Sequence, residues 1–233
     1  MTAPVDPPRR GIRSFVLRAG RITDAQRRAL EELWPRYGID APVGAAGPLD
    51  LDRQFGRSAA LTVEIGFGNG ENLAALAAAH PERNYLGIEV HRPGVGRLML
   101  QAEQHQLQNL RIATHDAVEV LQRWLAGGSI DELLILFPDP WHKARHHKRR
   151  LIQPAFAELA AGRLRRDGQL KLATDWQPYA EHMLEVLNAC PALRNLSADA
   201  TYVARPEWRI ETRFERRGAR LGHSVWDLAY VKR

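Results

Sequence analysis

The segment 133–151, which reads LLILFPDPWHKARHHKRRL, holds the residues best suited to do chemistry. An apolar run of β-strand length ends at Phe137 and is followed by Pro138–Pro140 and Trp141. Open α/β sheets bind ligands beyond the carboxyl ends of their strands, and here two prolines would fix the backbone at that point. Asp139, between the prolines, offers a carboxylate, and Trp141 offers a flat aromatic face. The segment therefore predicts a ligand-binding site centred on Asp139.

A dense basic segment follows Trp141 directly. It contains Lys143, Arg145, Lys148, Arg149 and Arg150, with His142, His146 and His147 among them. Basic side chains bind phosphates, and a carboxylate beside an aromatic face can hold an unstacked base. The segment predicts work on a nucleic-acid base, with a solvated basic surface as the alternative. No carboxylates at metal-ligand spacing accompany the histidines, so we expect no metal.

A second candidate site is the sequence EIGFGNG, whose glycines are Gly66, Gly68 and Gly70. Glycines that follow a strand allow a tight turn and close approach of a ligand to the backbone. The spacing is G-x-G-x-G, followed by Glu71, whereas a dinucleotide loop needs a small residue there. The acids Glu64 and Glu71 at the two ends disfavour a pyrophosphate and favour a positively charged cofactor without phosphate. S-adenosylmethionine has these properties.

Two further acids follow the next strands along the chain. Glu89 ends the second predicted strand, where an acid commonly accepts hydrogen bonds from both ribose hydroxyls. Asp116 follows the third strand and is placed to bind an adenine edge. Each acid alone could be a helix N-cap or a solvated side chain, and for Asp116 the N-cap alternative is strong. With Glu64, the set marks three successive strand ends and favours a cofactor site.

The elements that position these residues alternate from Leu61 onward. The predicted strands are 61–65, 84–89, 110–114, 133–137 and 169–174, and the predicted helices are 71–79, 95–105, 117–125, 151–164 and 179–187. Two further strand-like pieces are 194–197 and 225–231. Repeated βα units predict an α/β fold with a mainly parallel, doubly wound sheet and a C-terminal antiparallel strand.

The N-terminal part is expected to be an appendage to this sheet. Thr23 begins a capping-box sequence, TDAQ, which predicts a helix through Leu33. We therefore expect an N-terminal arm and helix at 1–57 and a catalytic domain at 58–233.

Composition narrows the class of protein. The 233 residues suffice for one sizeable core, and 33 Lys and Arg against 27 Asp and Glu suit a polyanionic partner. No apolar run approaches the roughly 20 residues of a membrane span, and the first residues lack the apolar core of a secretory signal. A single cysteine, Cys190, excludes an internal disulfide and a cysteine-based metal cluster. We expect a cytoplasmic protein without membrane association.

Taken together, the two motifs resemble the tRNA (guanine-N7-)-methyltransferase family. The resemblance runs from Arg13 almost to the C-terminus, through RSFVLRAGRITDAQ, VEIGFGNG, GIEVHRPGVGRL, FPDPWHKARHHKRRL, ATDWQPYA and TRFERRGARLGHSVWDL. PDPWHK with its basic tail and TRFE with the downstream LGH are specific in combination, whereas many methyltransferases share the glycine loop. Asn69 departs from the larger apolar residue that many members carry. The resemblance implies a Rossmann-like class I S-adenosylmethionine-dependent methyltransferase that modifies N7 of a guanosine in the variable loop of tRNA.

The resemblance also implies roles for single residues. The implied cofactor-binding residues are Glu64, Gly66, Gly68, Gly70, Glu89, Asp116 and Asp139, and Asp139 is also the implied catalytic acid. The implied substrate-binding residues are Lys143, Asp175, Thr212, Arg213, Phe214 and Glu215. The implied RNA-binding residues are Arg145, His146, His147, Lys148, Arg149 and Arg150. We expect tRNA as the partner, no obligate protein partner, and a monomer or homodimer.

Several alternatives stay open at the level of the residues. The PDPW sequence is similar to the D-P-P-W type loop of amino-group methyltransferases, which would act on an extruded adenine or cytosine. Identification of the methylated nucleoside would decide between the two. A non-catalytic RNA-binding or scaffold subunit would fail to bind S-adenosylmethionine, and a nicotinamide dehydrogenase is disfavoured by the loop spacing. Trp141 could be a core residue, and Asp175 could cap the helix that begins near Pro178.

Overall fold

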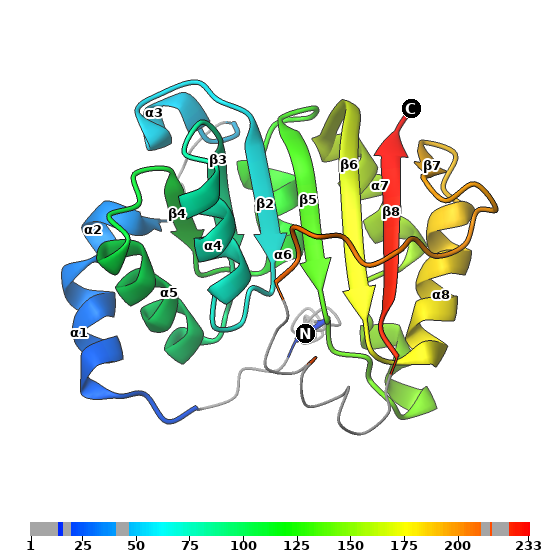
Figure 1. Ribbon diagram of the computed structural model, residues 1–233, viewed down its shortest axis with the longest axis horizontal. Coiled ribbons are helices and arrows are strands. Elements are labelled where there is room, and N and C mark those ends of the chain that lie inside the picture. The colour runs from blue at the N-terminus through cyan, green and yellow to red at the C-terminus, as the bar shows by residue number, and fades with distance from the viewer. Residues whose placement is uncertain (1–13, 16–19, 41–46, 211–214, 216–223) are drawn as a thin grey trace, which may run out of the picture.

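One mixed sheet forms the centre of the molecule (Figure 1). The computed structural model describes residues 14–15, 20–40, 47–210, 215 and 224–233. Eight strands of this part are ordered β1-β4-β3-β2-β5-β6-β8-β7. Their bounds are β1 Gly38–Ile39, β2 Leu61–Ile65, β3 Asn84–Ile88, β4 Leu110–Ala113, β5 Ile130–Leu136, β6 Leu164–Thr174, β7 Leu193–Asn195 and β8 Trp226–Lys232. β8 runs antiparallel to β6 and β7, and the other neighbouring pairs are parallel.

Helices cover both faces of the sheet. They are α1 Asp24–Glu32, α2 Trp34–Tyr37, α3 Leu51–Phe55, α4 Glu71–Ala79, α5 Arg92–Gln104, α6 Ala117–Glu119, α7 Pro154–Arg163 and α8 Gln177–Asn188. Figure 1 shows α1, α4 and α5 in front of the sheet and α7 behind it. Side chains such as Leu73 and Leu98 fill the core on the first face, and Phe156 and Met183 contribute to the core on the second. The predicted fold class, a mainly parallel doubly wound sheet with a C-terminal antiparallel strand, is confirmed.

The predicted order of strands and helices is also confirmed, with differences at the ends of elements. β2 and α4 have the predicted bounds, and every position of β2 and β3 is buried, as expected for strands covered on both faces. The predicted helix 117–125 is instead the short α6 followed by a π-helical turn, Val120–Trp124. The short elements β1, α2 and α3 and a 3-10 helix, Ala144–Arg149, come in addition to the predicted ones.

The described part of the N-terminal segment shares the core of the domain. Thr23 caps α1 through the predicted capping box with Gln26. A Cβ atom on Gly96 of α5 would lie 2.7 Å from the Gln26 carbonyl oxygen, so glycine allows the two helices to pack closely. Strand β1 extends the sheet beyond β4. A domain boundary after residue 57 stays a prediction, because no separate core lies on its N-terminal side within the described ranges.

The carboxyl ends of the parallel strands meet at the lower edge of the sheet in Figure 1. The predicted acids follow these strands in chain order, with Glu89 after β3, Asp116 after β4, Asp139 after β5 and Asp175 after β6. The fold therefore brings the predicted cofactor and substrate residues to one edge.

Candidate active site

A cavity of about 400 Å³ opens at this edge, a size typical of small-molecule sites. Its walls are made by Ser14, Phe15, Ile65, Gly66, Gly68, Ile88, Glu89, Val90, His91, His115, Ala117, Phe137, Pro138, Asp139 and Leu151. The cavity thus joins two glycines of the loop, the predicted ribose-binding acid and the predicted catalytic acid.

The glycine loop between β2 and α4 forms one wall of the cavity through Gly66 and Gly68. Gly66, Gly68 and Gly70 have φ angles of +73°, +57° and +76°, which favour glycine. A Cβ atom on Gly66 or Gly68 would meet nothing within 4 Å, so the backbone there is open to a ligand. A Cβ atom on Gly94, near the start of α5, would lie 2.0 Å from the Gly68 carbonyl oxygen. This wall is therefore made of backbone, and α5 supports it at close range.

Glu89 is held in place by backbone hydrogen bonds. Its carboxylate accepts the N–H groups of Gly68 at 3.0 Å, Val90 at 2.7 Å and His91 at 2.9 Å. A carboxylate can accept about four hydrogen bonds, so capacity remains for a ligand hydroxyl. The position of Glu89 in the cavity wall fits the predicted ribose-binding role.

Glu64 is buried next to the glycine loop. It is 3% exposed, and its carboxylate accepts a hydrogen bond from Asn72 Nδ2 at 3.2 Å. Burial raises the pKa of Glu64 to about 7, the bond from Asn72 opposes this rise, and the charge of Glu89 adds to it. A positive charge placed nearby, as a cationic cofactor would supply, would stabilise the ionised form of this carboxyl group.

Asp116 caps α6, as the alternative from the sequence proposed. Its Oδ1 accepts the Val118 N–H at 2.9 Å. The neighbours His115 and Ala117 line the cavity, whereas Asp116 lines an adjoining groove. Because capping uses one carboxylate oxygen, an additional role in adenine binding stays a prediction.

Asp139 lies at the cavity on an unusual stretch of backbone. Phe137 and Trp141 have φ angles of +53° and +48°, which are costly for bulky side chains and cluster at functional sites. Pro138 and Pro140 restrict the backbone between them. Asp139 is exposed, and its Oδ1 accepts the Trp141 N–H at 3.4 Å. The loop therefore presents a carboxylate to the cavity on a backbone with little freedom.

Trp141 is engaged on several sides. Its Nε1–H donates to the Ser14 carbonyl oxygen at 3.2 Å, and the Arg149 guanidinium carbon lies 4.2 Å from its ring centroid. His146 approaches the ring edge-on, with centroids 5.9 Å apart. The indole therefore holds Arg149 close to the Asp139 loop, and a base could stack on the ring face that Arg149 covers only by displacing the guanidinium.

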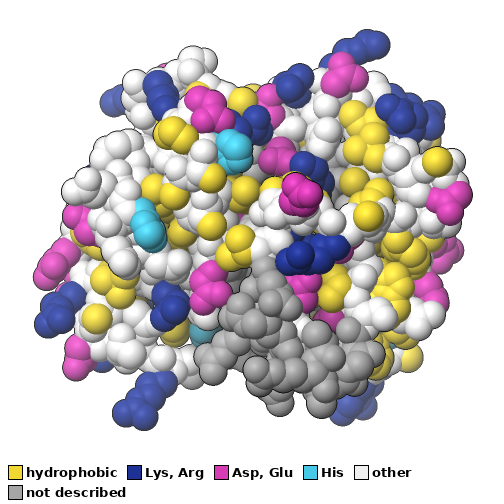
Figure 2. All heavy atoms as spheres, in the orientation of Figure 1, with side chains coloured by type: hydrophobic (Ala, Val, Ile, Leu, Met, Phe, Trp, Pro, Cys, Tyr) yellow, Lys and Arg dark blue, Asp and Glu magenta, His cyan; other side chains and the backbone are white. Residues whose placement is uncertain are grey.

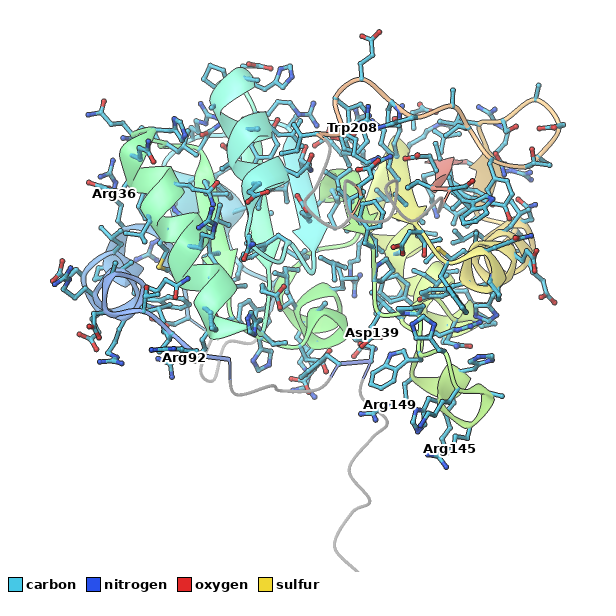
Figure 3. The ribbon with its side chains drawn as sticks, turned by 60° about the horizontal axis from the view of Figure 1, so that its bottom comes forward. Arg36, Arg92, Asp139, Arg145, Arg149 and Trp208 are labelled. Atoms are coloured by element: carbon cyan, nitrogen blue, oxygen red, sulfur yellow. The ribbon has the colours of Figure 1, made fainter. Side chains whose placement is uncertain are left out.

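The basic segment projects from the domain beyond Asp139 (Figure 3). It forms the 3-10 helix Ala144–Arg149, and Lys143, Arg145 and Lys148 are exposed. Partial burial and the neighbouring cations, led by Arg145, lower the pKa of His146. The segment thus offers several cations to a polyanion beside the cavity.

Arg150 differs from the rest of this segment. It is 5% exposed, and its guanidinium donates to the carbonyl oxygens of Pro140 at 3.0 Å and Pro178 at 3.5 Å. The guanidinium carbon also lies 4.8 Å from the ring centroid of Tyr179. Arg150 therefore ties the Asp139 loop to the start of α8, and we restrict the RNA-binding prediction to the residues that precede it.

The predicted substrate-binding residues have different positions. Asp175 is half-buried at the end of β6, and Lys143 is exposed beyond β5. Glu215 is 6% exposed, and its carboxylate pairs with Arg209 at 2.6 Å and Arg205 at 3.3 Å. The other predicted members, which lie outside the described residues, are Thr212, Arg213 and Phe214.

Two buried residues next to the site were not predicted. The guanidinium of Arg209 donates to both carboxylate oxygens of Asp227, at 2.9 and 3.0 Å, and lies 5.4 Å from the Phe137 ring centroid. A single arginine in a charged loop gives no sign of burial in the sequence. The available signal was Asp227 itself, an acid in the apolar run WDLAYV, because a buried acid needs a partner.

The face of the molecule drawn in Figure 2 carries charges of both signs. On the face drawn in Figure 2, Lys and Arg side chains are interspersed with Asp and Glu. Over the described ranges, no group of three or more His, Cys, Asp or Glu residues is arranged to hold a metal ion. In the same part of the chain, no helix is long and apolar enough to cross a membrane.

The sheet order, the glycine loop after β2 and the acid after β3 define a Rossmann-like class I S-adenosylmethionine-dependent methyltransferase. Solved structures share this fold. The 16S rRNA methyltransferase KamB matches with a TM-score of 0.56 and 17% identity over 92% of this chain and 96% of that one. A variant of the 16S rRNA (adenine(1408)-N(1))-methyltransferase of Catenulisporales acidiphilia, solved with its cosubstrate, has a TM-score of 0.54 and 16% identity, covering 79% of this chain and 92% of that one.

Sequence comparison gives the family. A family model described as "Putative methyltransferase" matches residues 58–228. The tRNA (guanine-N(7)-)-methyltransferase of Ectopseudomonas mendocina is 55% identical over 224 residues, which are 96% of this chain and 93% of that protein. The enzyme of the same name from Leifsonia xyli is 57% identical over 218 residues, 94% of each chain. The chain belongs to the tRNA (guanine-N7-)-methyltransferase family.

Proposed function

We propose that the protein transfers a methyl group from S-adenosylmethionine to N7 of a guanosine in the variable loop of tRNA. The observation that carries this proposal is one cavity that joins the glycine loop, Glu89 and Asp139, with exposed cations beside it. The chain is also 55% identical, over nearly its whole length, to enzymes named for methylation of guanine N7 in tRNA. As a member of this family, the protein is an S-adenosylmethionine-dependent tRNA methyltransferase.

The cavity fits this cofactor, which supplies an electrophilic methyl group when bound. Gly66 and Gly68 leave room for a ligand against the backbone, and Glu89 retains acceptor capacity for ribose hydroxyls. The buried carboxyl group of Glu64 favours a nearby cation. Asp116 is the candidate partner for the adenine edge.

Guanine N7 requires alignment more than proton transfer. Its lone pair lies in the ring plane and carries no proton, so no general base has to act before attack. The residues of the chain must hold the base in line and stabilise the positive charge that develops on the purine. Asp139 and Asp175 follow adjacent strands and can accept hydrogen bonds from the guanine N1–H and amino group. We assign Asp139 as the catalytic carboxylate.

The basic segment is the proposed contact to the tRNA backbone. Lys143, Arg145 and Lys148 are exposed, and Arg149 is held against Trp141 next to the Asp139 loop. Cations on one side of a base pocket can bind the phosphates that flank an extruded nucleotide. We further infer that the protein acts in the cytoplasm, as a monomer or a homodimer, with residues 58–233 as its catalytic domain.

The test is to map the methyl group after reaction with an unmodified tRNA transcript. N7 methylation makes guanosine sensitive to borohydride reduction, after which aniline cleaves the strand at that nucleotide. Cleavage at one variable-loop guanosine supports the proposal, and a transcript with adenosine at that position is the matched control. A tRNA that gains labelled methyl groups without becoming cleavable would refute the N7 assignment.

A further inference from the structure

Among the described residues, Arg209 has the largest fully buried side chain by volume. Its partners are charged. Its guanidinium forms a paired contact with Asp227 and donates to Glu215 at 2.6 Å. Arg205 in turn donates to Glu215 at 3.3 Å and to the Arg209 carbonyl oxygen at 2.9 Å. The contacts with Asp227 and Glu215 fix the fully buried guanidinium in position and orientation.

This cluster reaches from β8 to the end of β5, where the Asp139 loop begins. Asp227 on β8 is in register with Ala173 on β6, and Ala173 is in register with Leu136 on β5. The next residue, Phe137, donates its N–H to the Ala173 carbonyl oxygen at 2.8 Å. Arg209 therefore connects β8 with the residue at which β5 enters the Pro138–Pro140 turn.

Phe137 is the point of contact between the cluster and the cavity. It lines the cavity, has a φ angle of +53°, and has its ring centroid 5.4 Å from the Arg209 guanidinium carbon. A bulky residue keeps such a conformation only when its surroundings determine it. A fixed cation near the ring supplies such a constraint from outside the loop.

We propose that Arg209 is a positioning residue that holds Phe137, and through it the Asp139 carboxylate, in the geometry needed for methyl transfer. In this scheme Glu215 acts through Arg209 and does not contact guanine, which departs from the substrate-binding role implied by the resemblance. The inference rests on the proposed function. Buried ion clusters seldom add stability over apolar replacements of similar volume, so stability alone does not account for this cluster beside the site.

The test replaces the buried charges together, so that none is left unpaired. The triple variant Arg209→Met, Glu215→Gln, Asp227→Asn removes the cation, and Phe137→Leu removes the ring. Arg205→Met is the matched control, because this arginine also pairs with Glu215 but is half-exposed. The readouts are Tm, affinity for S-adenosylmethionine, single-turnover methylation of tRNA, and amide hydrogen exchange of a peptide spanning 134–142.

We expect the triple variant to fold and to bind S-adenosylmethionine within about threefold of wild type, with methyl transfer slowed at least about thirtyfold by misplacement of the loop. Phe137→Leu is expected to show a similar loss, and combining it with the triple variant is expected to add little. Amide exchange in 134–142 is expected to quicken in the triple variant and not in Arg205→Met. Unchanged methyl transfer, fully additive losses or unchanged exchange would each overturn the proposal.

Two further measurements keep the proposal testable if the triple variant does not fold or if the proposed function fails. If the triple variant does not fold, Arg209→Lys retains a cation, and its double-mutant cycle with Phe137→Leu replaces the triple variant. Independent effects of the two substitutions on methyl transfer would then contradict the positioning role. If the wild-type protein makes no 7-methylguanosine, the proposed function fails by itself, and the exchange data still decide whether Arg209 holds the loop.

Discussion

The two halves of the candidate active site differ in whether backbone or side chains form them. At the ends of β2 and β3, the backbone makes the site: glycines with positive φ angles form the wall, and Glu89 is anchored by three N–H groups. At the end of β5, exposed side chains make the site, on a loop that contains two bulky residues with positive φ angles. Arg150 and Arg209, both buried, support that loop from behind.

This difference determines which substitutions can change methyl transfer without changing the stability of the fold. A site made of backbone is damaged when a neighbouring residue moves the loop, whereas its own side chains matter less. A site made of exposed side chains can lose one group with little cost in stability, because surface substitutions usually change it by less than about 0.5 kcal/mol. The predictions below test this contrast, from the largest expected effect to the smallest.

The largest effect is expected for Asp139→Ala on the substrate side. Because Asp139 is exposed, the fold should be retained, while methyl transfer falls by about 10³-fold through loss of electrostatic alignment. Single-turnover rates with tRNA measure this. Asp139→Asn is the isosteric control, and a rate for Asp139→Ala within about threefold of wild type would remove Asp139 from the mechanism.

On the cofactor side, Gly94→Ala should act without touching the ligand. Its Cβ atom would lie 2.0 Å from the Gly68 carbonyl oxygen, so the loop must shift, and affinity for S-adenosylmethionine should fall about 10²-fold. Calorimetric titration measures the affinity. The matched control is Gly96→Ala, whose Cβ atom meets Gln26 of α1 instead and should lower stability only. Equal losses of affinity in both variants would contradict a backbone-made site.

The sequence predicted the backbone-made half better than the other half. Its signals are local, since G-x-G-x-G and the acid after β3 lie within single βα turns, and the structure places both at the cavity. The support of the Asp139 loop is not local. Arg209 reaches Phe137 from far along the chain, and nothing in its own neighbourhood marks it as buried.

Arg149 and Arg150 show that the local sequence also fails to distinguish a buried arginine from a half-exposed one next to it. The sequence gives both the appearance of RNA-binding groups, yet the turn that ends the 3-10 helix directs Arg150 inward to the carbonyl oxygens of Pro140 and Pro178. The same limit explains β1, whose two residues are too short to show a strand pattern and pair only because β4 leaves an open edge.

A smaller effect concerns the pH dependence of cofactor binding. The pKa of Glu64 is about 7 in the folded protein without ligand, because of burial, and the positive cofactor favours the ionised form. Affinity should therefore rise as pH increases toward about 7, by up to about tenfold per pH unit, and should level off above that pH. Titrations between about pH 5.5 and 8.5 measure this. Glu64→Gln should bind more weakly and remove this part of the profile, and an unchanged profile would exclude Glu64 as its source.

Glu64 also predicts how the free energy of unfolding depends on pH in the absence of cofactor. The folded protein holds a proton on Glu64 that the unfolded chain releases near the ordinary value of 4.5. The free energy of unfolding should therefore decrease as pH rises from about 4.5 to about 7, and Glu64→Gln should reduce this slope in denaturant titrations.

The smallest expected effect separates Arg149 from Arg150. Arg149→Gln should lower the salt slope of tRNA binding by about one unit for one lost phosphate contact. Arg150→Gln should leave the slope unchanged and lower the free energy of unfolding by about 0.5–1.5 kcal/mol, because two part-buried carbonyl groups lose their donor. Filter binding over a range of salt concentrations and denaturant titrations measure the two quantities. A reduced slope for Arg150→Gln would show that this arginine reaches RNA after all.

The most direct measurement is mass spectrometry of the nucleosides formed when the wild-type protein and Asp139→Ala are each incubated with S-adenosylmethionine and unmodified tRNA. The structure and the family predict 7-methylguanosine from the wild type and none from the variant, with both proteins folded. N6-methyladenosine or N4-methylcytidine from the wild type, or 7-methylguanosine from the variant at the wild-type rate, would contradict a guanine-N7 site organised by Asp139.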